Sequence, residues 1–183
     1  MPEVALKAAV YKLSQYYPTA GATEKVILRS AMIAAGADLV GGAIPGLAIP
    51  ATIISCFGTV WIMYGQLCSK LGISLKENVL KLLARAVLAN IAANLGGAIA
   101  ALLAGMLIPG ASIVVSAVVA FLTIYLAGLV FLRLIASLAE KSSDRTSFSD
   151  ISTHEMKKTA REMKVGKEDL EEAKKAYAEN KAQ

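Results

Sequence analysis

The longest uncharged stretch of the chain limits its fold more than any other feature. Between Arg85 and Arg133 lie 47 consecutive residues without a formal charge. A bilayer core about 30 Å thick is crossed by about 20 apolar residues of α-helix, so this stretch is long enough to cross twice. It is interrupted by Ile108-Pro109-Gly110, where proline ends a helix and glycine permits the backbone to reverse. The sequence therefore predicts two membrane-length helices, 86–107 and 111–132, joined by a tight turn.

A second uncharged stretch, nearer the N-terminus, has the same design. From Ser30 to Ser69 the one formal charge is Asp38, and the stretch is interrupted at Ile44-Pro45-Gly46. The two Ile-Pro-Gly triplets lie 64 residues apart, which fits either an internal duplication or two hairpins that share a turn type. The 14 residues between Arg29 and the turn give about 21 Å of helix. We therefore expect a shallow first hairpin, with Arg29 reaching the interface, or a re-entrant one.

These features predict an all-α membrane protein with about four transmembrane helices in two hairpins. Pro45 with Gly46 and Pro109 with Gly110 are the expected turn residues. An amphipathic helix precedes the hairpins, a cytoplasmic connection joins them, and a charged helical tail follows. The expected boundaries are 1–25 for the N-terminal helix, 26–140 for the membrane domain (hairpin 26–71, connection 72–85, hairpin 86–138) and 141–183 for the tail.

The distribution of charge sets the expected topology. The chain has 19 basic and 14 acidic residues and a net charge of +5, and residues 140–183 hold ten of each, so the whole excess lies before the tail. Both turns, 44–50 and 107–112, are uncharged, whereas basic residues flank the other ends of the helices. The positive-inside rule therefore predicts that both termini and the 72–85 connection are cytoplasmic, at an inner membrane. The excess positive charge is explained by this topology, and we expect no nucleic-acid partner.

The two ends of the chain carry charged helical segments. Apolar residues recur at helical spacing from Leu6 to Tyr17, which fits a helix lying on an anionic leaflet or one packed on the hairpins. The tail predicts helices at about 150–164 and 167–180, with charges of both signs that suit a solvated surface. Such a tail is either simply solvated or recruits a partner or a second copy.

Motifs that carry enzyme chemistry are missing from the sequence. It contains no P-loop, HExxH, GxSxG or CxxC pattern. Cys56 and Cys68 lie on one apolar helix and are expected to be buried thiols, and His154 is expected at the surface. We therefore predict no catalytic residue, no cofactor and no metal site.

Asp38 is the ionisable residue inside a predicted span. It follows Ser30 and Ala34 and precedes Gly42 at intervals of four, so we expect it to face a packed neighbour. A charged group within a bilayer is costly and often functional. Asp38 is therefore either a cation site or pore-lining acid, or a carboxylate that caps backbone groups freed near the first turn.

The third predicted span carries small residues and two amides. The small residues recur at intervals of four and would let helix backbones approach closely: Ala89, Ala93, Gly97, Ala101 and Gly105. Asn90 and Asn94 lie one position further round the helix. These amides either hydrogen-bond across helices or line a hydrated path.

The arrangement of turns and apolar helices resembles a known family. The residues that carry it are Gly41 to Gly46, Tyr64, Leu71-Gly72, Ile108 to Gly110, Val114, Ala117, Ala120, Tyr125, Ala127 and Gly128. Over about residues 25–140 they resemble the YcjF-like domain of unknown function, a bacterial membrane-hairpin family often attached to, or encoded beside, small GTPases. The resemblance implies a membrane hairpin fold, a GTPase as partner and no catalytic residue. The family often has an acid just after the turn, whereas Asp38 precedes it, so no role carries over to Asp38.

Two functions follow from the sequence. The first is an oligomeric ion channel or pore, lined by Asp38, Asn90 and Asn94 in several copies of the chain. The second is a membrane anchor or scaffold that recruits a cytoplasmic partner, such as a GTPase, through the tail. A pore-forming protein delivered in soluble form is a more distant third, because its apolar hairpins would need shielding before insertion.

Overall fold

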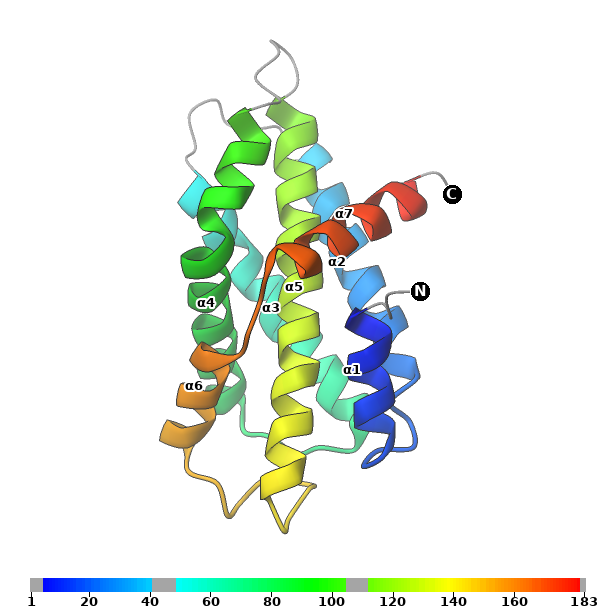
Figure 1. The fold of residues 1–183 in the computed structure, drawn as a ribbon, viewed down its shortest axis with the longest axis vertical. Coiled ribbons are helices and arrows are strands. Elements are labelled where there is room, and N and C mark those ends of the chain that lie inside the picture. Colours follow the sequence, from blue (N-terminus) through cyan, green and yellow to red (C-terminus); the bar gives the residue numbers. More distant parts are fainter. Residues whose placement is uncertain (1–4, 41–48, 105–111, 182–183) are drawn as a thin grey trace.

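The computed structural model of the chain describes residues 5–40, 49–104 and 112–181 (Figure 1). Side chains at residues 37–40, 49–55, 96, 98–104 and 112–116 lie outside that description. The described residues form seven α-helices and no strand, which confirms the all-α class. The helices are α1 Ala5–Ser14, α2 Ala22–Val40, α3 Ile49–Leu71, α4 Glu77–Ala104, α5 Ser112–Lys141, α6 Thr153–Glu162 and α7 Lys167–Lys181.

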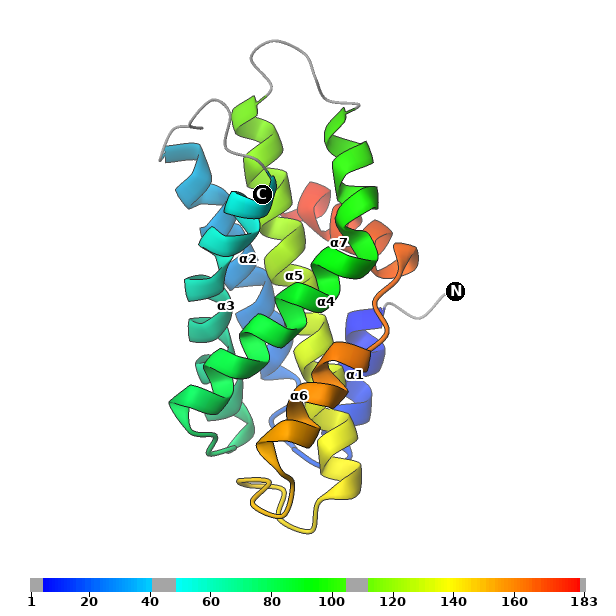
Figure 2. The ribbon, with the colours of Figure 1, turned by 90° about the vertical axis from the view of Figure 1, so that its left-hand side faces the viewer.

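Helix α5 is the central element of the bundle. In both views α2 and α3 lie along one side of it and α4 along another, while α1, α6 and α7 cover parts of its remaining surface (Figures 1 and 2). Every residue from Ala117 to Leu132 is buried. Apolar residues occur on every side of this segment, so no polar face favours exposure to water. Other helices therefore bury it on every side.

Close contacts fix α5 against its two neighbours on the α2–α3 side. The Tyr64 ring stacks on Phe131 with centroids 3.9 Å apart, and its hydroxyl donates to the Ala127 carbonyl oxygen at 3.0 Å. Gly128 allows α2 to approach, because a Cβ there would lie 2.7 Å from Cγ1 of Ile27. The α2–α5 contact therefore depends on the missing side chain at residue 128.

Two helices in the described part of the chain are long and apolar enough to cross a membrane. They lie at Glu77–Leu95, with 19 residues, and at Ala117–Lys141, with 25. Both overlap the predicted second hairpin (86–138), but the first begins within the predicted cytoplasmic connection (72–85). Half of the first stretch and 94% of the second are buried inside the bundle, and the core helix of a soluble protein has the same length and composition. The four membrane spans therefore stay a prediction.

The C-terminal segment packs against the bundle instead of extending into solvent. Helix α6 lies on α4 and the lower part of α5, and α7 crosses the upper part of α5 (Figures 1 and 2). The helices lie close to the predicted ranges, but the segment buries apolar residues in the helices and in the connections before them: Phe148, Ile151, Met156, Ala160, Val165, Leu170 and Ala173. The interpretation of a solvated tail was wrong, because the high charge of these helices masks apolar residues at helical spacing.

The N-terminal helix α1 also packs on α5. Leu6, Leu13 and Tyr17 are buried, and Val10 is half-buried against the core. At its end, Nζ of Lys12 lies 2.7 Å from Oε1 of Glu140. Of the two interpretations of this helix, packing on the hairpins is the one observed.

Candidate functional site

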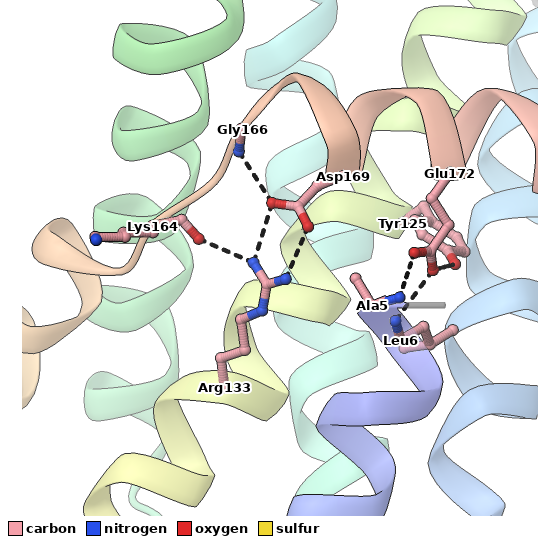
Figure 3. Close-up of polar contacts among 8 residues, drawn as sticks. All are labelled: Ala5, Leu6, Tyr125, Arg133, Lys164, Gly166, Asp169 and Glu172. Carbon is pink, nitrogen blue, oxygen red and sulfur yellow. Dashed lines mark hydrogen bonds and ion pairs between the residues drawn. The ribbon is translucent and has the colours of Figure 1, made fainter. Parts of the chain in front are cut away.

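Polar contacts join the C-terminal segment to the apolar helices, and they are concentrated on five side chains. Asn90 on α4, Tyr125 and Arg133 on α5, and Asp169 and Glu172 on α7 make these contacts. We call this group the clasp. Figure 3 shows two of these contacts side by side: Arg133 with Asp169, and Tyr125 with Glu172.

The Arg133–Asp169 pair is the ionic part of the clasp. Nη1 of Arg133 donates to Oδ2 of Asp169 at 3.0 Å and Nη2 donates to Oδ1 at 2.7 Å, a two-pronged geometry that is the strongest available to this pair (Figure 3). Nη1 also reaches the Lys164 carbonyl oxygen at 2.9 Å, and Oδ2 accepts from the Gly166 N–H at 2.9 Å. The side chain of Asp169 is 9% exposed and that of Arg133 29%. Each charge thus depends on the other for compensation.

Glu172 ties three helices together. Its Oε1 accepts from the Tyr125 hydroxyl at 2.7 Å and from the Leu6 N–H at 3.0 Å, and its Oε2 accepts from the Ala5 N–H (Figure 3). The first N–H groups of a helix have no partner within it and carry partial positive charge. A carboxylate from α7 therefore caps the N-terminus of α1 and holds both against α5.

Asn90 attaches the end of α6 to α4. Its Nδ2 donates to the carbonyl oxygens of Ala160 at 3.0 Å and Met163 at 2.8 Å, which are among the carbonyls left without helical partners at the end of α6. Asn90 is 4% exposed, whereas Asn94 is exposed and donates to the Asn90 carbonyl oxygen at 2.9 Å. Of the two roles predicted for Asn90, hydrogen bonding between helices is the one observed.

The other predicted site residues are distributed as follows. Ala89, Ala93 and Gly97 lie on the exposed side of α4, so this part of the small-residue stripe does not pack inside the chain. Asp38 belongs to α2 and Ala101 to α4, but their side chains lie outside the described residues, as do Gly105, Pro45, Gly46, Pro109 and Gly110 entirely. The proposed roles of Asp38 and of the two turns stay predictions.

A tight turn after α5 returns the chain to the bundle. The Asp144 carboxylate accepts hydrogen bonds from the hydroxyl groups of Ser147, Thr146 and Ser149, and these bonds hold its pKa well below the usual range. Phe148 is buried and has φ of 52°, a left-handed conformation that reverses the backbone. The chain reverses direction at this turn, so that α6 packs against α4 and α5 and α7 packs against α5.

The Tyr17 hydroxyl joins the same turn to the N-terminal end of the chain. It donates to the Arg145 carbonyl oxygen at 2.8 Å, and burial raises the pKa of Tyr17 to about 12. Tyr17 therefore stays a neutral donor over the physiological pH range. The turn is thus held to the bundle at its base as well as through the helices that follow it.

Two surface grooves border α7. One, of about 670 Å³, lies between the end of α6 and the start of α7 and includes Arg133, Lys164 and Lys167. The other, of about 430 Å³, lies where Asn180 meets α2 and includes Arg29. In the described part of the chain no group of three or more His, Cys, Asp or Glu side chains is arranged to hold a metal ion.

Comparison with family models, curated proteins and solved structures finds no match to this chain. The resemblance to the YcjF-like family therefore stays a prediction. Among the clasp residues, Asn90 alone was a site candidate from the sequence, and Tyr125 entered only through the family resemblance. The pairing of Arg133 with Asp169 joins residues 36 positions apart, and the one available signal was the apolar spacing within the tail.

Proposed function

We propose that the protein is a non-enzymatic membrane anchor in a cytoplasmic (inner) membrane, with both termini in the cytoplasm. Its apolar hairpins hold it in the bilayer, and the outer surfaces of α6 and α7 form a platform for a cytoplasmic protein. The observation that carries this proposal is the clasp, because it fixes the charged helices to the flank of the apolar ones. The result is a single body with one uncharged end and one charged end.

The uncharged end supports the membrane part of the proposal. After Arg29 and before Lys70, Asp38 is the one charged residue, and none lies between Arg85 and Arg133. Two helices have the length and composition of a membrane span, although 94% of the second stretch is buried inside the bundle. Ile33, the first large side chain after Arg29 that points outward, is 59% exposed. Lipid chains would remove this apolar surface from water.

The contacts of Asn90 favour an anchor over a channel. An ion path requires polar groups that face a hydrated space. Nδ2 of Asn90 is engaged by two carbonyl oxygens, and residues 117–132 of α5 lie in a packed apolar core. A channel would therefore require several copies, and the exposed residues Ala89 and Ala93 are available for such a contact. A homo-oligomer stays a prediction from the sequence.

The proposed partner surface is the outer side of the C-terminal segment. It exposes charges of both signs at Glu155, Lys158 and Arg161 on α6 and at Glu168 and Glu171 on α7. Because the clasp fixes these helices, a partner would bind a surface that is already ordered, which lowers the entropic cost of association. A small GTPase is the partner that the family resemblance suggests.

Membrane association is tested on the full chain. Purified protein is mixed with vesicles of phosphatidylcholine and phosphatidylglycerol and floated through a density gradient, and cell membranes are washed with alkaline carbonate. We expect the protein to float with the vesicles and to stay in the washed membrane pellet. Recovery in the soluble fraction of both experiments would overturn the anchor.

Partner binding is tested by charge reversal on α6. Lys158→Glu together with Arg161→Glu leaves the clasp intact, whereas removal of the whole segment would strip cover from α5. The matched control is Lys76→Glu, which changes an exposed charge in the α3–α4 connection. We expect the double variant to lose about tenfold in recovery of a purified small GTPase, the partner class that the resemblance suggests, while the control does not. Equal recovery by all three proteins would exclude the α6 surface.

A further inference from the structure

We infer that the groove between α2 and the end of α7 binds one phospholipid molecule. The phosphate contacts Lys25 and Arg29, and an acyl chain lies along Leu28, Met32 and Ile33. This site goes beyond the proposed anchor, because it adds a ligand and depends neither on a protein partner nor on the number of helices that cross the bilayer.

The groove contains two basic side chains without an acidic partner. Its volume is about 430 Å³, within the range of small-ligand sites, and Lys25 and Arg29 line it from one side of α2. Both residues are exposed. The ion pairs among the described residues are formed by other cations: Lys12, Lys81, Arg133, Lys174 and Lys175. Lys25 and Arg29 are therefore available to an anion, and phosphate is the group that both side chains bind well.

Apolar residues continue the groove along α2 toward the uncharged end of the protein. Leu28 and Met32 line the groove beside the two cations and are half-buried. Ile33 lies four residues beyond Arg29, about 6 Å further along the same side of the helix, and is 59% exposed. Charge is thus followed by apolar surface, which is the order of phosphate and acyl chain in a phospholipid. A soluble phosphate compound would leave the apolar part uncovered.

Two further polar residues favour a phosphate with a single negative charge. Nδ2 of Asn180 donates one hydrogen to the Ala176 carbonyl oxygen at 2.8 Å, and its second hydrogen has no acceptor among the described residues. Glu24 also lines the groove, so one carboxylate stands against the two cations and the net charge is +1. This charge complements the phosphate diester of a phospholipid such as phosphatidylglycerol.

The position of the groove on α2 gives it access to lipid in the proposed anchor. Arg29 is the last basic residue before the stretch from Ser30 to Ser69, in which Asp38 is the one charge. The groove therefore lies where α2 passes from the headgroup region toward hydrocarbon. At a surface with anionic lipid each basic residue contributes about 1 kcal/mol of attraction, which raises the local concentration of the ligand.

The test measures binding of a short-chain lipid to the full chain in dodecyl maltoside micelles. Dihexanoyl phosphatidylglycerol is titrated in a calorimeter, and the heat of the lipid entering empty micelles is subtracted. The variant is Lys25→Gln with Arg29→Gln. The control is Lys70→Gln with Lys76→Gln, which removes two exposed charges outside the groove. We expect the variant to bind about tenfold more weakly than the wild-type chain and the control to bind equally well. Equal affinity in all three proteins would overturn the site.

Soluble phosphates distinguish a lipid site from a general anion site. Inorganic phosphate and glycerol phosphate should bind at least about tenfold more weakly than the lipid, because neither covers the apolar residues. Affinity equal to that of the lipid would overturn the assignment to phospholipid. Ile33→Ser, at an exposed position, should weaken lipid binding and leave the binding of glycerol phosphate unchanged. Unchanged lipid binding in this variant would overturn the placement of the acyl chain.

Flotation with vesicles separates the lipid site from the anchor. The variant of Lys25 and Arg29 should still float, because its apolar helices are unchanged, and circular dichroism should show the helix content of the wild-type chain. A wild-type protein that floats but binds the short-chain lipid no better than this variant loses the site and keeps the anchor. A wild-type protein that does not float, yet binds the lipid through Lys25 and Arg29, loses the anchor and keeps the site.

Discussion

Helices α4 and α5 come from the same uncharged stretch of sequence, yet their surroundings differ. Between Ala117 and Leu132 α5 is buried on all sides, whereas α4 exposes Ala89, Ala93 and Gly97. The difference lies in how the large apolar side chains are distributed: on α5 they occur all round the helix, whereas the exposed side of α4 carries small residues with little apolar area to bury. Hydropathy alone does not separate a helix at the centre of a bundle from one at its edge.

Helices α4 and α5 also differ in where the C-terminal segment covers them. The clasp places α7 across α5, and α6 lies against α4 nearer the base of the bundle. The covered part of α5 is therefore kept from lipid and from water by helices rich in charged residues, five of ten in α6 and nine of fifteen in α7. Changes that break the clasp or disturb the packing around α5 should therefore lower the free energy of unfolding, and matched changes on the exposed side of α4 should not.

The largest effect is expected from Arg133→Met. The change leaves the Asp169 carboxylate buried without its partner, and breaking such a pair costs about 3–5 kcal/mol. We expect a loss near the lower end of that range in the free energy of unfolding, measured by chemical denaturation in detergent micelles, because Arg133 itself is partly exposed. Proteolysis within α7 should become faster.

A double variant separates the ion pair from the packing around it. Arg133→Met with Asp169→Leu replaces both charges by apolar groups, a change that is often close to neutral. The double variant should therefore be more stable than Arg133→Met alone. If the losses of the two single variants simply add, the two side chains are not coupled and the clasp does not act as described.

The next largest effect tests α5 against α4 directly with two glycines. In Gly128→Ala the new Cβ would lie 2.7 Å from Cγ1 of Ile27, and overpacking of this kind costs about 1–3 kcal/mol. Gly97 has no atom within 4 Å of the same position, so Gly97→Ala should stabilise α4 by up to about 1 kcal/mol. Thermal unfolding of the two variants side by side gives the measurement.

A second substitution tests whether the effect of Gly128→Ala comes from contact with Ile27. Ile27→Ala removes the atoms that the new methyl group would meet, so it should cost less in the Gly128→Ala background than in the wild-type chain. Equal costs in the two backgrounds would show that α2 and α5 are not packed as closely as Gly128 indicates.

The sequence predicted the helices better than their packing. The tail helices expected at 150–164 and 167–180 are found at Thr153–Glu162 and Lys167–Lys181, because charged helices with turn residues between them have clear local signals. Their attachment to α4 and α5 was missed. It depends on pairs such as Arg133 with Asp169, and nothing in one sequence identifies which two distant charges meet.

The partners of Asn90 could not be identified from the sequence for the same reason. Its place beside the small-residue stripe left two roles open, a polar contact between helices or the lining of a hydrated path, and in the structure Asn90 donates to two carbonyl oxygens. Its partner was expected on another membrane helix, whereas it is the end of α6. Residue type and spacing showed that an amide on α4 needs partners, but the identity of those partners is set by how the C-terminal segment folds back.

A smaller effect is expected from Glu172→Gln. The variant keeps an acceptor for the Tyr125 hydroxyl but removes the charge that caps α1, and hydrogen bonds to a charged group contribute about 1.5–3 kcal/mol. We expect a loss of about 1.5 kcal/mol and faster hydrogen exchange at the amide of Leu6. Glu171→Gln is the control, since Glu171 is exposed and its bond to Lys174 is worth under about 1 kcal/mol. Similar losses in both variants would rule out a capping role for Glu172.

The smallest effect concerns the interior of α5 itself. Oγ1 of Thr123 is the buried side-chain polar atom for which the described part of the chain provides no hydrogen-bond partner. Burying an unsatisfied hydroxyl costs about 1–3 kcal/mol, and valine has nearly the same shape without it. Thr123→Val should therefore raise the free energy of unfolding by about 1 kcal/mol. In contrast, Thr159 on α6 donates to the Glu155 carbonyl oxygen at 2.9 Å, so Thr159→Val should lower it by about the same amount. A loss of stability in Thr123→Val would mean that this hydroxyl is bonded, and that the covered centre of α5 is less apolar than its surroundings indicate.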